Sequence, residues 1–174
     1  MPGEGPDDAE VIFVGEAPGF HEDQQGRPFV GAAGEFLEEL LGSIGLTRED
    51  VFITNVIKCR PPGNRDPLPQ EICACQPYLD RQIELIQPTV VVTLGRFSMA
   101  RAFPKARISR VHGQPRKIDG IVYYPMYHPA AALHRPSLRT TVEADMRRIP
   151  DIVERAPQMA ESEAPPQAEQ LQLF

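Results

Sequence analysis

Phe29, Asn55 and His128 are the side chains of this sequence best suited to recognise or activate a ligand. Phe29 lies in a glycine-rich loop after one apolar run, Asn55 lies inside a second, and His128 precedes a proline at the end of a third. An aromatic ring can stack on a flat ligand, and a primary amide offers a donor beside an acceptor, as a pyrimidine edge requires. A histidine at the end of a strand is well placed to act in a cleft.

Each of the three residues also has a purely structural interpretation. The ring of Phe29 could anchor its loop to the core, and backbone groups could satisfy the amide of Asn55 inside the sheet. A single histidine is more often structural than catalytic. The loop around Phe29 matches neither GxGxxG nor the P-loop pattern, which disfavours a nucleotide-phosphate site. Residue type alone leaves the alternatives open.

Apolar runs that alternate with helical patterns must position these residues. The runs typical of buried strands are residues 10–15, 51–57, 89–95 and 120–129. The helical patterns are residues 34–46, 69–88, 96–103 and 137–156, with Pro77 and Pro150 as points where a helix could break. We therefore predict an α/β fold over residues 1–156: a three-layer α/β/α domain around a central, mostly parallel four-stranded sheet. Sites in such sheets lie at the carboxyl ends of the strands.

Charge is distributed unevenly along the chain. Residues 1–50 carry twelve acidic and two basic residues, whereas residues 96–150 carry eleven basic and three acidic residues. A phosphate-binding face would leave such a basic segment, although chance clustering on a solvated surface would look the same. Residues 157–174 are rich in Pro, Glu and Gln, and we predict that they form a disordered tail.

No apolar stretch approaches the roughly 20 residues of a membrane span, and no secretory signal pattern is present. All three cysteines, Cys59, Cys73 and Cys75, lie close together in the sequence. Three thiols cannot all pair as disulfides, and a four-cysteine metal site would need one more. Together with free thiols, these features predict a cytoplasmic protein that does not bind a membrane. We also expect the protein to be a monomer.

The motifs GEAPG (15–19), GRPFVG (26–31), TNVIKCRPPGNR (54–65) and HPAAAL (128–133), in this order, resemble those of a family-4 uracil-DNA glycosylase, the iron–sulfur type. The resemblance covers about residues 3–150. It implies a monofunctional enzyme of base excision repair that hydrolyses the N-glycosidic bond of uracil in DNA, releases free uracil and leaves an abasic site. A non-catalytic DNA-binding protein that retains the fold is the alternative hypothesis.

The resemblance also implies roles for individual residues. Phe29 stacks on a flipped-out uracil, Asn55 binds the uracil edge and selects against cytosine, and His128 donates to uracil O2 and stabilises the anionic leaving group. The pocket near the sugar and the attacking water is lined by Glu16 and by the backbone of Ala17, Pro18 and Gly19. Other uracil glycosylases place an aspartate where this chain has Ala17. We therefore expect the catalytic carboxylate to be Glu16 first and Glu22 second.

The segment that follows His128 is expected to contact DNA. By resemblance, this loop enters the minor groove and wedges the duplex open. Its expected DNA-binding residues are Leu133, His134, Arg135 and Arg139.

In the family, four cysteines hold a 4Fe–4S cluster, and Cys59 and Cys75 match two of them. Cys73 is then a bystander. The N-terminal CxxC that supplies the other two ligands does not occur in this sequence. We expect that the sequence is truncated; a subgroup that has discarded the cluster is the alternative. We expect the cluster to be incomplete or absent in this chain.

The sequence ends in QLQLF, which follows the pattern of a peptide that binds the bacterial sliding clamp. The predicted clamp-binding residues are Gln170, Leu171, Leu173 and Phe174. Apolar anchors on a tether would fill a groove of the clamp while the domain stays free to swing. An end that packs on its own domain is the alternative.

Overall fold

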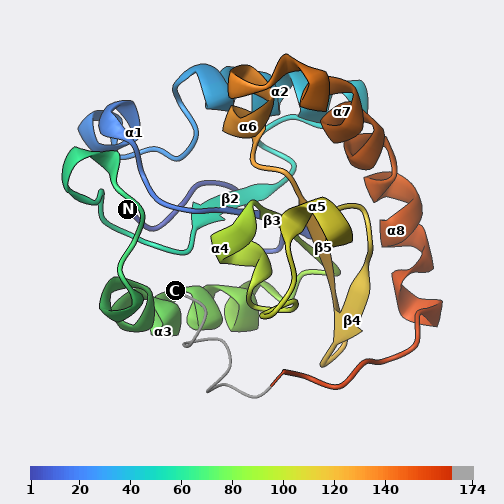
Figure 1. Ribbon diagram of the computed structural model, residues 1–174. Coiled ribbons are helices and arrows are strands. Elements are labelled where there is room, and N and C mark those ends of the chain that lie inside the picture. Colours follow the sequence, from blue (N-terminus) through green and yellow to red (C-terminus); the bar gives the residue numbers. More distant parts are fainter. Residues whose placement is uncertain (166–174) are drawn as a thin grey trace.

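Five strands form one sheet, in the order β2-β1-β3-β5-β4, in the computed structural model, which describes residues 1–165 (Figure 1). The strands are β1 (Val11–Gly15), β2 (Phe52–Asn55), β3 (Val90–Leu94), β4 (Arg116–Ile118) and β5 (Ile121–Met126). β1, β2, β3 and β5 are parallel, and β4 is antiparallel to β5. Gly15 pairs with Asn55, so the ends of β1 and β2 meet at one edge of the sheet.

Helices cover both faces of this sheet. They are α1 (Phe20–Gln25), α2 (Ala32–Ser43), α3 (Pro69–Ile86), α4 (Arg96–Met99), α5 (Ile108–Val111), α6 (Pro129–His134), α7 (Arg139–Arg147) and α8 (Ile149–Arg155). In Figure 1, α2, α6 and α7 lie on one side of the sheet and α3 lies on the other. The described core accordingly forms two clusters of buried side chains, one on each face.

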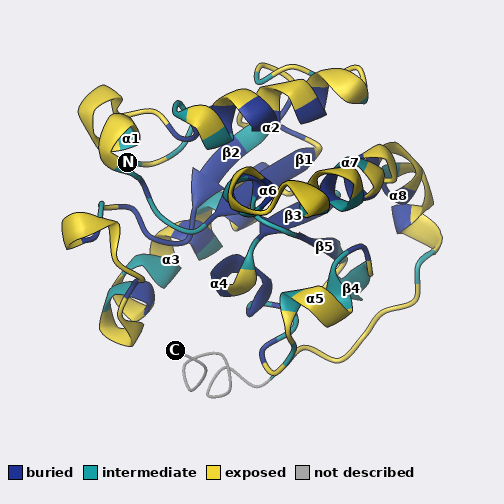
Figure 2. Ribbon diagram, turned by 45° about the horizontal axis from the view of Figure 1, so that its top comes forward, coloured by how far each residue is buried: buried dark blue, intermediate teal, exposed yellow. Residues whose placement is uncertain are grey.

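The alternation of side chains along β1 shows how one strand serves both clusters. Phe13 packs with the cluster that contains Leu37 of α2, whereas Ile12 packs with the cluster that contains Ile83 of α3. Every residue of β1 and β3 is buried, as expected for parallel strands covered on both faces. Figure 2 shows the same contrast, with buried strands beneath helices whose outer surfaces are exposed.

The three-layer α/β/α architecture predicted from the sequence is confirmed, with one strand more than the four expected. The additional strand, β4, has three residues, of which Arg116 and Lys117 are charged. A short, charged edge strand lacks the apolar run that identifies a buried strand, and edge strands commonly carry such charges. The sequence-based prediction therefore missed β4 because its charged residues hide the strand pattern.

The two prolines in the predicted helices behave differently. α3 continues through Pro77. The predicted helix over residues 137–156 is instead two helices, because α7 ends at Arg147 and Pro150 lies in the first turn of α8. A proline is tolerated in the first turn, where its missing N–H has no helical partner to lose.

Part of the predicted tail contacts the sheet edge. The backbone N–H of Ser162 donates to the carbonyl of Lys117 at 2.7 Å, and the N–H of Gly120 donates to Oε1 of Glu161 at 2.9 Å. The predicted clamp-binding residues lie outside the described residues. Within residues 1–165, no helix combines the length and the apolar character needed to cross a membrane.

Candidate active site

A cavity of about 190 Å³ opens at the carboxyl ends of the parallel strands. It brings together Phe29, Asn55 and His128, which come from the segments that follow β1, end β2 and follow β5. The complete lining is Ala17, Gly19, Glu22, Phe29, Ala33, Asn55 and His128. Of the other residues predicted to line it, Glu16 and Pro18 are not part of this wall.

Phe29 is part of the buried core and also lines the cavity, so core packing and exposure to a ligand are combined in one ring. The ring is stacked on the imidazole of His128, with centroids 5.4 Å apart and an angle of 22° between the planes. Its backbone φ is 53°, in the left-handed region that bulky residues rarely adopt. Gly34 permits this conformation, since a Cβ there would lie 1.8 Å from the carbonyl oxygen of Phe29.

Asn55 is the last residue of β2 and is 4% exposed. Across the described part of the chain, its side-chain amide has no hydrogen-bond partner. A buried amide normally has its donors and acceptor satisfied, so this group is available to a ligand in the cavity. Gly15 allows the close packing here, because a Cβ at that position would lie 2.5 Å from Oδ1 of Asn55 and 2.6 Å from Cζ of Phe29.

His128 caps the N-terminus of α6. Its Nδ1 accepts a hydrogen bond from the backbone N–H of Ala130 at 3.1 Å. In the neutral ring, the proton therefore lies on Nε2, which makes that atom a donor. Desolvation lowers the pKa of His128 to about 4, although the nearby carboxylate of Glu22 acts in the opposite direction. The site thus holds a neutral imidazole with a defined tautomer near pH 7.

Glu22 is engaged with the backbone of its own loop. Its Oε2 accepts from the N–H of Gly19 at 3.1 Å, and its Oε1 accepts from Val30 at 3.1 Å and Gly31 at 3.2 Å. Burial raises the pKa of Glu22, but the backbone hydrogen bonds outweigh it and leave the pKa below its usual value. Its carboxylate therefore joins the two ends of the loop that carries Phe29.

Glu16 lies half-buried just before the residues that form the cavity wall. Burial, with a further contribution from nearby Asp66, raises the pKa of Glu16, and Arg96 partly offsets this. Arg96 itself is paired with Asp66. Glu16 is therefore the carboxylate near this site that no described hydrogen bond occupies.

The segment predicted to contact DNA begins at the same histidine. Leu133 lies about 7.5 Å further along the axis of α6, from the helical rise per residue. It is 44% exposed, and His134 and Arg135 beside it are also exposed. Arg139 is already paired with Glu39 at 2.7 Å and Glu143 at 2.9 Å.

The predicted metal ligands Cys59 and Cys75 do not form a complete site. Cys59 is exposed, and the Sγ of Cys75 accepts from the backbone N–H of Lys58 at 3.4 Å. Residues 1–165 contain no group of three or more His, Cys, Asp or Glu side chains that could hold a metal ion. A 4Fe–4S cluster as a rule needs four thiolates, and the sequence has three cysteines, so the residues present do not fit it.

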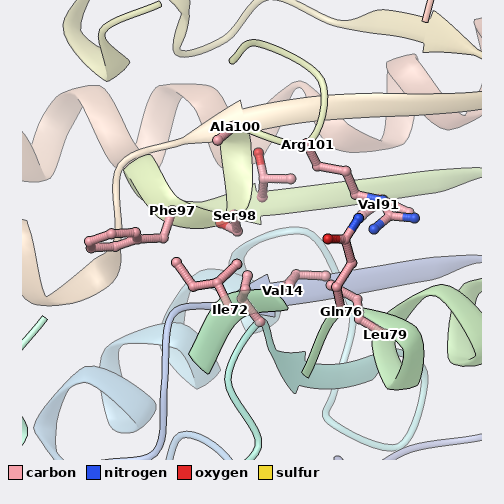
Figure 3. A pocket seen from close by; sticks show the side chains of 11 residues that line it. Val14, Ile72, Gln76, Leu79, Val91, Phe97, Ser98, Ala100 and Arg101 are labelled. Atoms are coloured by element: carbon pink, nitrogen blue, oxygen red, sulfur yellow. The ribbon is translucent and has the colours of Figure 1, made fainter. Parts of the chain in front are cut away.

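A second cavity lies between the sheet and α3, beside α4 (Figure 3). It measures about 40 Å³ and is lined mainly by apolar side chains, including Val14, Ile72 and Phe97. Thr93 contributes a buried hydroxyl that has no hydrogen-bond partner among the described residues. Its size suits a solvent molecule, and we assign the chemistry to the cavity that Phe29, Asn55 and His128 line.

Sequence reasoning missed two cations with little solvent exposure, the buried Lys58 and the half-buried Arg48. Lys58 is 9% exposed, and its Nζ donates to Thr54 and to Gln82, each at 2.7 Å. Burial lowers the pKa of Lys58 to about 8, with partial compensation from Cys75. Arg48 contacts the backbone of the Phe29 loop. Both are common surface residue types, and no sequence pattern marks them as shielded from solvent.

The fold is that of an α/β/α protein whose cavity, at the carboxyl ends of a parallel sheet, is lined by an aromatic ring, an amide and an imidazole. The family model described as the uracil DNA glycosylase superfamily matches residues 2–148, and the chain belongs to this superfamily. This confirms the resemblance inferred from the motifs.

Several curated relatives bear the name type-4 uracil-DNA glycosylase. The protein from Sulfurisphaera tokodaii is 52% identical over 87% of this chain and 74% of its own length. The Saccharolobus solfataricus protein is 50% identical over 90% of this chain and 77% of its own length. The Thermotoga maritima protein is 44% identical over 88% of this chain and 82% of its own length.

Proposed function

We propose that this chain hydrolyses the N-glycosidic bond between uracil and deoxyribose in DNA, which releases uracil and leaves an abasic site. The observation that carries the proposal is the convergence of Phe29, Asn55 and His128 on one cavity of about 190 Å³. The shared name of the relatives supports the same activity. Release of uracil from an oligonucleotide that contains a single uracil, compared with one that contains thymine, tests the proposal.

Phe29 and Asn55 provide recognition in this mechanism. The extruded base stacks on the ring of Phe29, which its loop already holds in place. The amide of Asn55 offers a donor to O4 of uracil and an acceptor to its ring N–H. Cytosine has an amino group where uracil has O4, so the amide donor would face another donor. A buried, mismatched pair of this kind disfavours cytosine strongly.

His128 stabilises the departing base. Cleavage of the glycosidic bond leaves the bonding electrons on uracil, whose negative charge is spread over the ring and its oxygens. The Nε2–H of the neutral imidazole is a fixed donor for O2 of this anion. Because the donor is neutral, it needs no protonation at pH 7, and the tautomer is defined before the substrate arrives.

Glu16 is the proposed group that positions the attacking water or stabilises the cationic sugar. Glu16 directly precedes Ala17 of the cavity wall in the chain, and no described hydrogen bond is made to its carboxylate. Glu22, the second candidate from the sequence, has its oxygens occupied by backbone N–H groups. We therefore assign Glu22 to holding the loop and retain Glu16 for the chemistry.

Two partners complete the proposal. DNA would lie across α6, with Leu133 as a wedge and His134, Arg135 and Arg139 near the phosphates. A bacterial sliding clamp would take the C-terminal residues Gln170, Leu171, Leu173 and Phe174. We expect this chain to bind no complete iron–sulfur cluster; stoichiometric iron and sulfide in anaerobically purified protein would contradict this. A cytoplasmic location and a monomeric state stay predictions.

A further inference from the structure

The loop that carries Phe29 is held from two opposite sides. Phe29 has a φ of 53°, and a bulky residue keeps such a strained conformation only where the surrounding structure imposes it. On one side, the N–H groups of Val30 and Gly31 donate to Glu22. The carbonyl oxygens of Pro28 and Phe29, on the other side of the left-handed residue, have a separate partner.

Arg48 provides that partner. Its Nη2 donates to the carbonyl of Pro28 at 2.5 Å, and its Nη1 donates to the carbonyl of Phe29 at 2.9 Å. The side chain is 11% exposed, so these charge-assisted hydrogen bonds are shielded from solvent. The two terminal nitrogens of one guanidinium thus hold the carbonyls immediately before and after the Cα of Phe29, the residue in the left-handed conformation.

Glu4 holds the arginine in turn. Its Oε1 lies 3.4 Å from Nε of Arg48, and the same carboxylate receives two hydrogen bonds from Arg27, at 2.7 and 2.9 Å. Glu4 is itself fixed to the edge of the sheet by reciprocal backbone hydrogen bonds with Ile53, at 2.9 and 2.8 Å. A chain of contacts therefore connects the edge of the sheet to the backbone of Phe29.

We infer that Arg48 is a positioning residue for base recognition, which keeps the ring of Phe29 stacked against His128 and flush with the cavity. The inference rests on the proposed function for its catalytic consequence. Its structural consequence, the stacking of the Phe29 ring on the His128 ring, does not depend on that function. Arg48 does not contact the cavity itself and acts through Phe29.

Replacing Arg48 with Met removes the donors and keeps much of the side-chain volume. We expect kcat/KM for uracil release to fall about tenfold, the value of one stacked base. If Arg48 acts through the ring, the Arg48→Met change should have no further effect in a Phe29→Leu background. Arg81→Met is the matched control, since Arg81 is an exposed cation paired with Glu84 on α3.

A second readout does not depend on activity. When the Phe29 ring moves away from His128, solvent should reach the imidazole and raise its pKa from about 4 toward 6.5. Glu22 is the charged group that acts on this imidazole, and both Arg48 variants retain it. NMR titration of the His128 ring in wild type, Arg48→Met and Arg48→Lys measures this shift, with Lys expected to restore part of the wild-type value.

The outcomes separate the two proposals. A shifted His128 pKa with no uracil release by wild type would support the positioning role and refute the proposed function. An unchanged His128 pKa in both Arg48 variants would overturn the positioning role. The positioning role would also be overturned if the two substitutions acted independently. In that case the fold-loss of activity in the double variant would equal the product of the losses from Arg48→Met and Phe29→Leu. If Arg48→Met does not fold, the same comparisons apply to Arg48→Lys, which keeps the charge but loses the two-pronged contact.

Discussion

The backbone N–H of Ala130 donates to Nδ1 of His128 at 3.1 Å, so the helix that follows the histidine determines where its ring carries a proton. The same hydrogen bond caps the helix, which links the local fold to the chemistry. Because the ring is desolvated, it stays neutral near pH 7. A structural capping contact thereby prepares a hydrogen-bond donor at Nε2.

This arrangement predicts a dependence of stability on pH. The pKa of His128 is about 4 in the folded protein and 6.5 for an ordinary histidine, so the unfolded chain binds more protons between these values. Stability contributed by the neutral ring is therefore present above about pH 6.5 and is lost as the pH falls toward 4. Urea unfolding at pH 7 and pH 5 should show a larger loss for wild type than for His128→Asn, which retains a capping side chain. Equal losses in the two proteins would contradict the low pKa.

Gly15→Ala should damage the site. The new methyl group would lie within 2.6 Å of both Asn55 and Phe29, and neither buried side chain can move without disturbing the cavity. We expect a loss of about 1–3 kcal/mol in the free energy of unfolding and a larger fractional loss of uracil release. Gly42→Ala is the control, because its Cβ would meet nothing within 4 Å in α2. Thermal unfolding and uracil release are measured for both variants. Equal stability and equal activity of Gly15→Ala and Gly42→Ala would refute this account of Gly15.

Leu133→Ala tests the wedge. Opening a duplex costs a few kcal/mol, whereas a single strand has already exposed its bases. We expect kcat/KM to fall about tenfold on double-stranded substrate and to change little on single-stranded substrate. Leu85, which is 64% exposed on α3, provides a matched control for loss of a surface leucine. Equal losses on the two substrates would argue against a wedge.

Deletion of residues 170–174 tests the clamp proposal. Surface plasmon resonance against an immobilised bacterial sliding clamp should lose its signal, since the apolar anchors are removed. Uracil release from short oligonucleotides should stay at the wild-type rate, because the deleted residues are not among residues 2–148, which the family model matches. Undiminished clamp binding by the shortened protein would end the proposal.

The sequence was sufficient to predict the strands and helices with strong apolar patterns, and the candidate site residues in or beside the strands. Apolar runs marked the four parallel strands, and Asn55 stood out as an amide within such a run. β4 was missed because a three-residue edge strand with two charges has no apolar period. Arg48 and Glu4 were missed for a different reason. They lie 44 residues apart, and only the folded sheet edge brings them together beside Phe29.

Glu22 shows a third kind of difference between sequence and structure. Its residue type and loop position suggested a catalytic carboxylate, and it does line the cavity. Three backbone N–H groups nevertheless occupy its oxygens. Hydrogen bonds to the backbone of a loop depend on the exact path of that loop, which residue patterns do not specify.

The most direct test of the central claim is single-turnover release of uracil from an end-labelled oligonucleotide that contains one uracil, followed by alkaline cleavage of the abasic site. We predict cleavage at the uracil by wild type, a rate about 10²–10³-fold lower for His128→Ala, and a large loss for Asn55→Asp. A thymine-only oligonucleotide should stay intact. Absence of cleavage by well-folded wild type, or equal rates for wild type and both variants, would contradict the claim that this cavity excises uracil.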